Sequence, residues 1–291
     1  MTLDPGGNDM SLPTPPPLGT SMLPTDTYAG QVVIVTGGGT GLGRAMAVEF
    51  ARLGAAIAVA SRKSEHRQAG IEALSALGAE AIGVEVDVRD PHGVAAMFDE
   101  AERKLGPTDV LINNAAGNFP CQAVKLSVNA WRSVVDIVLN GTFLCSTEFA
   151  RRAIARGAAG AVLNIGATYA WTGGPGTAHS AAAKAGVTNL TQSLAVEWAP
   201  YGIRVNCLAP GLFPHPDLPP ALLARQNPEA DAKRIPAGRV GQPHELGWAA
   251  TYLCSPYAAY LSGHTMVLDG ANWLRRSLMM PEFVPIDQQF P

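Results

Sequence analysis

Short runs of consecutive apolar residues alternate with longer amphipathic stretches along most of the chain. The short runs predict strands that are buried on both faces, because such strands have no polar side. They cover residues 31–36, 56–60, 81–86, 108–113, 161–166, 202–209 and 264–269. The longer stretches predict helices at 41–53, 65–77, 91–104, 128–156, 177–199 and 243–254. Strands that alternate with helices form βαβ units, so we expect one α/β domain with a doubly wound, seven-stranded parallel sheet and helices on both faces.

The segments outside this pattern have a different composition. Residues 1–28 contain the run 13-PTPPP-17 and few apolar side chains, which is typical of a mobile or surface-lying arm. A long Pro-rich interruption at 211–240 precedes the last helix, and we expect a substrate loop or lid there. The globular domain is therefore predicted to span 29–276, followed by a C-terminal tail at 277–291.

Composition and charge narrow the class of protein. Hydrophobic residues make up 47% of the chain and charged residues 15%, which is enough apolar material for a sizeable core. The net charge of −3 gives no basis for nucleic-acid binding, and no apolar run is long enough for membrane insertion. The arm has no secretory-signal pattern and no Lys or Arg. Four cysteines without C-x-x-C spacing are typical of free thiols in a reducing compartment, so we expect a cytoplasmic protein without a metal site.

A glycine-rich turn follows the first predicted strand, in the segment 36-TGGGTGLGRAMA-47. Gly37, Gly41 and Gly43 have the spacing G-x-x-x-G-x-G, and the turn opens the first predicted helix. Glycine permits positive φ and lets main-chain N–H groups approach a pyrophosphate, while the helix points its positive end at that charge. We therefore predict a Rossmann-like domain with a dinucleotide site here; a merely tight turn is the alternative.

The choice between NAD and NADP depends on the end of the second strand, where an acidic residue would bind the ribose 2′-hydroxyl. This chain has 60-ASRKS-64, with no acid before Glu65. Ser61, Arg62 and Lys63 can bind a 2′-phosphate, which the forked guanidinium group suits well. The segment thus favours NADPH, although a solvated basic loop would have the same composition.

The order of several motifs resembles the short-chain dehydrogenase/reductase superfamily over about residues 30–275. The motifs are the glycine turn, 112-INNAAG-117, Asn140, Lys184 and 209-APG-211. The resemblance implies a homotetramer in which the long helices near 128–156 and 177–199 pair across a two-fold axis. It also implies further cofactor contacts from Thr40, Leu42, Asp87, Val88, Asn114, Lys184 and Gly211.

The catalytic segment departs from the common pattern of that superfamily, which uses Asn, Ser, Tyr and Lys. Asn140 and Lys184 match. The tyrosine position, four residues before the lysine, is Ser180, and the serine position, seventeen residues before it, is Ala167. Two of the four groups that serve ordinary carbonyl reduction are therefore missing.

A narrower resemblance accounts for this departure. The segments 112-INNAAGNFP-120, 136-DIVLNGTF-143, 168-TYAW-171 and 179-HSAAAKAGV-187 resemble the 2,4-dienoyl-CoA reductases, particularly the bacterial ones of fatty-acid β-oxidation. In that group a tyrosine fifteen residues before the lysine, here Tyr169, and an asparagine after the NNAAG run, here Asn118, serve the substrate. The resemblance implies the catalytic set Tyr169, Asn118, Lys184, Ser180 and Asn140.

The chemistry of a dienoyl thioester explains why a donor would move. Hydride goes to C5, and negative charge then develops several bonds away on the thioester oxygen, so a stabilising donor must follow that oxygen. Tyr169 and Asn118 are the candidates. Lys184 and Ser180 are four residues apart, which puts them on one face of a helix, where Lys184 would hold the nicotinamide ribose. We expect an acyl-CoA substrate bound by Asn118, Phe119, Tyr169 and Ser180, with Phe119, Trp171 and Phe213 around the acyl chain and Arg275 and Arg276 near the CoA phosphates.

Other interpretations fit part of the pattern. A 2-enoyl-CoA or 3-oxoacyl reductase of the same superfamily would carry a similar helix after residue 179. A non-catalytic NADP-binding regulator would explain the missing serine and tyrosine. Individually, Tyr169 could be a core aromatic, Asn118 a turn former and Asn140 a residue at a helix kink.

Overall fold

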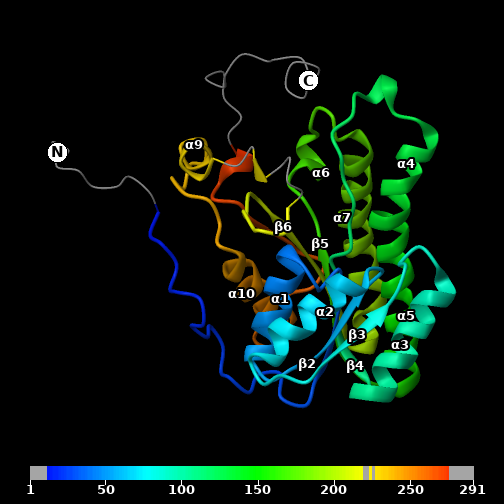
Figure 1. The fold of residues 1–291 in the computed structure, drawn as a ribbon. Coiled ribbons are helices and arrows are strands. Elements are labelled where there is room, and N and C mark those ends of the chain that lie inside the picture. Colours follow the sequence, from blue (N-terminus) through cyan, green and yellow to red (C-terminus); the bar gives the residue numbers. More distant parts are fainter. Residues whose placement is uncertain (1–11, 219–222, 225–226, 275–291) are drawn as a thin grey trace.

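The computed structural model describes residues 12–218, 223–224 and 227–274 of the chain (Figure 1). Seven parallel strands form one sheet in the order β3-β2-β1-β4-β5-β6-β7, which confirms the predicted doubly wound architecture. The strands are β1 Val32–Thr36, β2 Ala56–Ser61, β3 Ala81–Glu85, β4 Thr108–Asn113, β5 Gly160–Ile165, β6 Ile203–Pro210 and β7 Thr265–Leu268. The order reverses at β1, so the carboxyl ends of β1 and β4 border the crevice where such sheets bind ligands.

Helices cover both faces of the sheet (Figure 1). One face carries α1 Gly41–Arg52, α2 Ser64–Ser75 and α10 Pro243–Cys254, and the other carries α3 Pro91–Leu105, α5 Gly141–Arg156 and α7 Ala178–Trp198. Alternate side chains of each strand enter opposite cores: in β1, Val33 and Val35 lie in the first and Ile34 lies in the second. The described residues also form the α-helices α4 Val128–Val135, α6 Tyr169–Thr172 and α9 Pro228–Ala232.

The stretch 128–156 is helical throughout, as predicted, but it is not α-helical throughout. A π-helical segment, Asp136–Asn140, separates α4 from α5. A Cβ atom on Gly141 would lie 2.6 Å from Val88 Cγ2, so the glycine allows α5 to pass close to the end of β3. The wider π turn changes which side chains face the crevice, because it changes the angle between successive residues.

Residues 12–28, at the end of the proposed arm, lie along the domain surface beside α10. The main-chain N–H of Leu12 donates to the Ala237 carbonyl at 2.7 Å, and Trp248 Nε1 donates to the Thr20 carbonyl at 3.1 Å. Tyr28 is fully buried, and its hydroxyl donates to the Thr251 carbonyl at 2.5 Å. Burial raises the pKa of this phenol far above its ordinary value. Tyr28 therefore belongs to the core of the domain, although its position in the sequence assigned it to the arm.

Other sequence predictions fall partly outside the described residues. Arg275, Arg276 and the proposed tail at 277–291 lie outside them. Within the described ranges, no helix is long and apolar enough to cross a membrane.

Candidate functional site

The glycine turn between β1 and α1 forms one wall of a cleft at the carboxyl edge of the sheet. Gly37 and Gly41 have φ values of 66° and 51°, in the left-handed region that favours glycine. A Cβ atom on Gly43 would lie 2.3 Å from the Gly37 carbonyl oxygen. The turn thus brings the main chain close to the cleft at the positive end of α1, which suits a pyrophosphate and so fits a nicotinamide dinucleotide.

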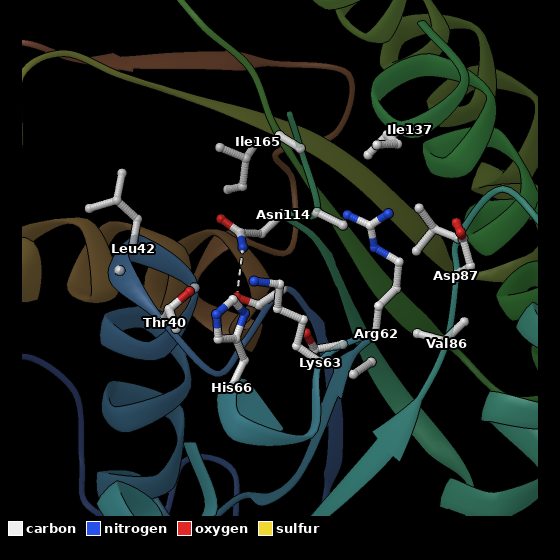
Figure 2. A pocket seen from close by; sticks show the side chains of 18 of the residues that line it. Thr40, Leu42, Arg62, Lys63, His66, Val86, Asp87, Asn114, Ile137 and Ile165 are labelled. Atoms are coloured by element: carbon white, nitrogen blue, oxygen red, sulfur yellow. Dashed lines mark hydrogen bonds between the residues drawn. The ribbon is translucent and has the colours of Figure 1, made fainter. Parts of the chain in front are cut away.

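The cleft has a volume of about 440 Å³ and opens beside this turn (Figure 2). It brings together all of the predicted cofactor contacts except one: Gly37, Thr40, Gly41, Leu42, Gly43, Ser61, Arg62, Lys63, Asp87, Val88, Asn114 and Lys184. Gly211 is the exception. It packs against β7, where an added Cβ atom would lie 2.4 Å from Asp269 Cβ, and this close approach accounts for the glycine.

The basic residues after β2 lie at the mouth of the cleft. Arg62 is exposed and extends into the cleft, while Lys63 lies closer to the glycine turn (Figure 2). Lys63 Nζ is 3.7 Å from Glu65 Oε1, but both side chains are solvent-exposed, so this pair holds Lys63 weakly. Arg67 donates to the main-chain carbonyls of Ser61 at 2.8 Å and Arg62 at 2.9 Å. Arg67 thereby fixes the course of the loop, a role that the sequence pattern did not reveal.

Asp87, after β3, is held by its neighbour Arg89 through side-chain and main-chain hydrogen bonds. The hydrogen bonds from Arg89 hold the pKa of the Asp87 carboxyl below its ordinary value, so the group is an acceptor at neutral pH. The next residue, Val88, is buried beneath Gly141. This end of the cleft therefore presents a fixed carboxylate beside an apolar floor.

Asn114 ties the end of β4 to the glycine turn. Its side-chain amide donates to the carbonyls of Thr36 at 2.9 Å and Gly37 at 3.2 Å, the first of which belongs to β1. Its main-chain N–H donates to the Thr36 hydroxyl at 3.0 Å. The two strand ends at the reversal of the sheet are thus cross-linked, which keeps the cleft floor in one geometry.

A buried polar network lies directly beneath this floor. The Asn113 amide donates to Ser146 Oγ at 2.8 Å and to Asn164 Oδ1 at 2.9 Å, and the Asn164 amide donates to Thr191 Oγ1 at 2.9 Å. The four side chains join β4, β5, α5 and α7, and all are buried. Buried polar groups of this kind rigidify a core when every member has a partner. The signal in the sequence was one asparagine near the end of each of the predicted strands 108–113 and 161–166.

Lys184 lies at the inner end of the cleft on α7. Its side chain is buried, and the ammonium donates to the main-chain carbonyl of Ile165. Burial lowers the pKa of Lys184 to about 8, and the nearby Cys207 thiol opposes that shift. Lys184 therefore carries a charge that is easily lost, in a place where a bound anion would stabilise it.

Tyr169 and Ser180 meet one helical turn away from Lys184. The Tyr169 hydroxyl is 3.1 Å from Ser180 Oγ, and either atom can donate. Tyr169 begins the short helix α6 after β5, while Ser180 is buried in the first turn of α7. Ala167, at the place of the usual serine, is also buried and offers no hydroxyl. The structure thus joins the two hydroxyls that the sequence placed eleven residues apart.

Asn140 does not join these groups. It is exposed, and its amide donates to Asp136 Oδ1 at 2.9 Å. Ile137, three residues earlier in the π segment, lines the cleft instead. The π segment is the physical reason, because its wider turn rotates Asn140 away from the face that Ile137 occupies. The placement of Asn140 gives no support to the catalytic role predicted for it.

The predicted substrate residues lie in three different environments. Asn118 is exposed in the loop after β4. Phe119 is 38% exposed and meets the buried His179 ring edge to face, with ring centroids 4.6 Å apart. Trp171 is also partly exposed, against Trp273.

Phe213 differs from the expectation that it would border an acyl chain. It is buried in the core beneath Gly241, where an added Cβ atom would lie 2.3 Å from the Phe213 ring. The aromatic ring therefore fixes the loop after β6.

Several cleft residues were not foreseen from the sequence: His66, Ala115, Ala116, Ile137, Ile165, Gly166 and His215. Most follow directly from strand ends that had been located, so proximity to those ends was an available signal. His215 lies in the predicted loop 211–240, but no pattern in the sequence singled out this residue of the loop. Among the described residues, no group of three or more His, Cys, Asp or Glu side chains could hold a metal ion.

The fold, the glycine turn and the buried Lys184 together define a nicotinamide-dependent oxidoreductase. The chain belongs to the short-chain dehydrogenase/reductase superfamily. A family model described as enoyl-(acyl carrier protein) reductase matches residues 37–271. The chain is 42% identical over 246 residues to a Bacillus subtilis (strain 168) protein named "Probable 2,4-dienoyl-CoA reductase, (2E)-enoyl-CoA-producing", covering 84% of this chain and 97% of the relative.

Two further comparisons agree with that assignment. The chain is 38% identical over 254 residues to a Rattus norvegicus protein named "Peroxisomal 2,4-dienoyl-CoA reductase, (3E)-enoyl-CoA-producing", with 86% of each chain covered. The crystal structure of a short-chain dehydrogenase from Bacillus anthracis superimposes with a TM-score of 0.78 at 42% identity, covering 85% of this chain and 98% of that one.

Proposed function

We propose that the protein catalyses the NADPH-dependent reduction of a 2,4-dienoyl-CoA to an enoyl-CoA, a step in the β-oxidation of unsaturated fatty acids. The observation that carries this proposal is the 3.1 Å contact between the Tyr169 hydroxyl and Ser180 Oγ, one helical turn from Lys184. This phenol follows β5 and so differs from the acid of ordinary carbonyl reductases, which lies four residues before the lysine. The names of the Bacillus subtilis and rat relatives support the same activity.

The side chains account for the charge that the reaction creates. When bound, the reduced nicotinamide would supply a hydride to C5 of the substrate, and negative charge would then develop on the thioester oxygen. Tyr169 donates its hydroxyl to that oxygen, and Asn118 supplies a second donor from the loop after β4. One donor of this kind is worth roughly 3–4 kcal/mol of barrier. A water molecule then protonates carbon, so the phenol stays un-ionised.

Ser180 and Lys184 hold the reacting groups in place. Ser180 hydrogen-bonds the Tyr169 hydroxyl and limits the directions in which the phenol can donate. Lys184 is held by the Ile165 carbonyl, and it would hold the ribose next to the nicotinamide while adding positive charge to the cleft. These roles need no Ser at position 167, which agrees with the alanine found there.

The preference for NADPH is supported by the loop after β2. Ser61, Arg62 and Lys63 line the cleft, and Arg62 extends into it (Figure 2). The acid nearest to them along the chain, Glu65, lies in the first turn of α2 and is exposed, and Asp87 of the same cleft follows β3 rather than β2. A 2′-phosphate could bind the Ser61 hydroxyl and the cationic groups of Arg62 and Lys63, whereas a free 2′-hydroxyl would have no carboxylate acceptor at the end of β2.

We further propose that the protein works as a homotetramer in the cytoplasm. Large apolar side chains on three neighbouring helices are exposed in the single chain: Val128 and Trp131 on α4, Phe143 on α5 and Val196 on α7. These residues lie on the helices that the resemblance pairs across a two-fold axis, where a partner chain would cover them. Light scattering at micromolar concentration should therefore report four chains, and a monomer would contradict the proposal.

The decisive experiment is a substrate panel with purified full-length protein, in which loss of NADPH absorbance is followed. A 2,4-dienoyl-CoA should be reduced, and a 2-enoyl-CoA or 3-oxoacyl-CoA of the same chain length should be reduced far more slowly. Preference for either of the latter would replace the proposal with the corresponding reductase. Binding of NADPH without turnover of any substrate would favour a regulator instead. Product analysis would distinguish the 2-enoyl from the 3-enoyl isomer, which the two named relatives form respectively.

A further inference from the structure

His179, near the start of α7, has a polar ring that the free protein leaves without partners. The residue is 1% exposed, and both ring nitrogens, Nδ1 and Nε2, are buried with no hydrogen-bond partner. Among the described residues, no other side chain has two buried polar atoms in this state. A neutral imidazole has one donor and one acceptor, and buried groups of this kind are usually paired. The free protein therefore buries both groups of this ring at a cost in stability.

The surroundings of His179 would suit an apolar side chain. One turn further along α7 lies Ala183, which belongs to an apolar cluster with Val134 and Val138. Residues four positions apart share a face of a helix, so the imidazole extends this apolar face. The Phe119 ring meets it edge to face, with centroids 4.6 Å apart. A phenylalanine would make the same kind of contacts without burying two polar atoms, so packing alone gives no reason for a histidine.

The loop after β4 is fastened to the start of α7 beside this ring. The main-chain N–H of Cys121 donates to the Gly176 carbonyl at 2.9 Å, and Phe119 contacts His179. Phe119 is 38% exposed and lies in a stretch without regular secondary structure. A shift of this exposed phenyl ring would therefore uncover the imidazole.

The chain neighbours of this ring pair are the groups assigned to the substrate. Ser180 follows His179 directly, and its hydroxyl is 3.1 Å from the Tyr169 hydroxyl. Asn118 directly precedes Phe119. The imidazole thus lies beside both segments that supply donors to the thioester oxygen.

We propose that His179 is a further substrate-binding residue, whose imidazole hydrogen-bonds the amide group nearest to the thioester of the bound acyl-CoA. This inference rests on the proposed function for the class of substrate. In CoA, two methylene groups separate the thioester sulfur from that amide, so the amide lies close to the donors that hold the thioester. Its C=O and N–H match the donor and the acceptor of a neutral imidazole, whereas the thioester oxygen only accepts. When the substrate binds, the Phe119 ring moves aside and the nitrogens of His179 gain partners.

This role predicts opposite effects on stability and on substrate affinity. His179→Phe and His179→Leu remove both unpaired nitrogens, so each should raise the Tm of the free protein by about 3 °C. The leucine is included because the larger phenyl ring can strain a packed core. Both variants should weaken binding of a saturated acyl-CoA about tenfold, because they leave the substrate amide unpaired. His179→Gln keeps a donor and an acceptor, so its Kd should stay within about threefold of the original.

The experiment is an isothermal titration of full-length protein, saturated with NADP+, with a short saturated acyl-CoA that cannot be reduced. Scanning calorimetry of the free variants gives the Tm values. The Kd for NADPH should be the same in all variants, and a loss that matched that of the acyl-CoA would overturn the proposal. As a matched control, His92→Phe makes the same exchange at an exposed position on α3 and should change neither the Tm nor the acyl-CoA Kd.

Smaller thioesters locate the contact on the substrate. An N-acetylcysteamine thioester keeps the first amide of CoA, whereas a propyl thioester of the same acid has no amide. His179→Leu should weaken binding of the first about tenfold and leave binding of the second unchanged. Equal losses for the two would place the imidazole on the thioester itself, which would overturn the assignment to the amide.

Two other results would overturn the proposal. An unchanged acyl-CoA Kd in both His179→Phe and His179→Leu would show that the ring serves packing only. A lower Tm in both, together with weaker binding, would show that the nitrogens stabilise the free protein and act through the fold. Because the titrations need no turnover, failure of the reductase assignment would show itself separately, as normal acyl-CoA binding by the unmodified protein without reduction of a 2,4-dienoyl-CoA.

Discussion

The cofactor half of the cleft is built from main-chain groups at neighbouring strand ends, whereas the half assigned to the substrate is built from side chains of separate segments. Gly37, Gly41 and Gly43 form the first half, and Asn114 fastens it to β4 through three hydrogen bonds. In the second half, a single contact joins Tyr169 to Ser180. The first half therefore tolerates few substitutions near the turn, while the second depends on individual hydroxyl and amide groups.

This difference makes the two halves separable by experiment. A side chain of the substrate half should change turnover without changing NADPH affinity, and a side chain of the cofactor half should do the reverse. Three substitutions and one pH profile test that separation, and they follow in order of decreasing expected effect.

Tyr169→Phe should lower turnover of a 2,4-dienoyl-CoA by about a hundredfold or more, the scale for loss of one donor to a developing oxyanion. The ring stays and only the hydroxyl is lost, so NADPH affinity should barely change. Steady-state kinetics together with an NADPH titration measure both quantities. Normal turnover in Tyr169→Phe combined with an inactive Ser180→Ala would show that the donor has stayed near the lysine.

Arg62→Ala should weaken NADPH binding by about thirtyfold, which corresponds to about 2 kcal/mol for a charge-assisted contact. NADH binding should change little, because NADH has no 2′-phosphate for Arg62 to meet. Turnover at saturating NADPH should stay close to that of the unmodified protein. Equal losses for the two cofactors would contradict a 2′-phosphate contact at this position.

The pH dependence tests Lys184, which lies between the two halves. Burial lowers its pKa to about 8, so its charge is present below that pH and is lost as the pH rises. Because the proposed role needs the charged form, kcat/KM should fall by about tenfold per pH unit above this pKa. In Lys184→Arg, which keeps its charge, the fall should disappear. A flat profile across alkaline pH in the unmodified protein would count against a role for the charge.

Ser180→Ala should have the smallest effect, about fivefold on turnover, because it removes one neutral hydrogen bond to the Tyr169 hydroxyl. The phenol keeps its place in α6 and can still donate. The NADPH Kd should stay within experimental error. A loss as large as that of Tyr169→Phe would mean that Ser180 touches the substrate itself.

Much of the fold could be predicted because its signals are short-range. The buried strands are runs such as 56–60 that have no polar face, and their alternation with amphipathic helices leads directly to a parallel sheet. The prediction of helical structure over 128–156 was confirmed, but its π segment was not foreseen, since the apolar pattern is the same on both sides of that segment. Tyr28 was misplaced for a similar reason: a single aromatic in a Pro-rich stretch gives no sign that it enters the core.

The sequence by itself determined the cofactor half of the cleft. A phosphate-binding turn needs glycines at set spacings within one βαβ unit, and these spacings can be read directly from the sequence. Only the tertiary structure decided which distant side chains meet there. The proximity of Tyr169 to Ser180 depends on how α6 packs on α7, and the outward direction of Asn140 depends on a π turn. The contact of Asp217 with Gly41 and Arg44 joins residues that are separated by 176 and 173 positions. No local pattern specifies such contacts, because they arise only when the whole sheet has brought its strand ends to one edge.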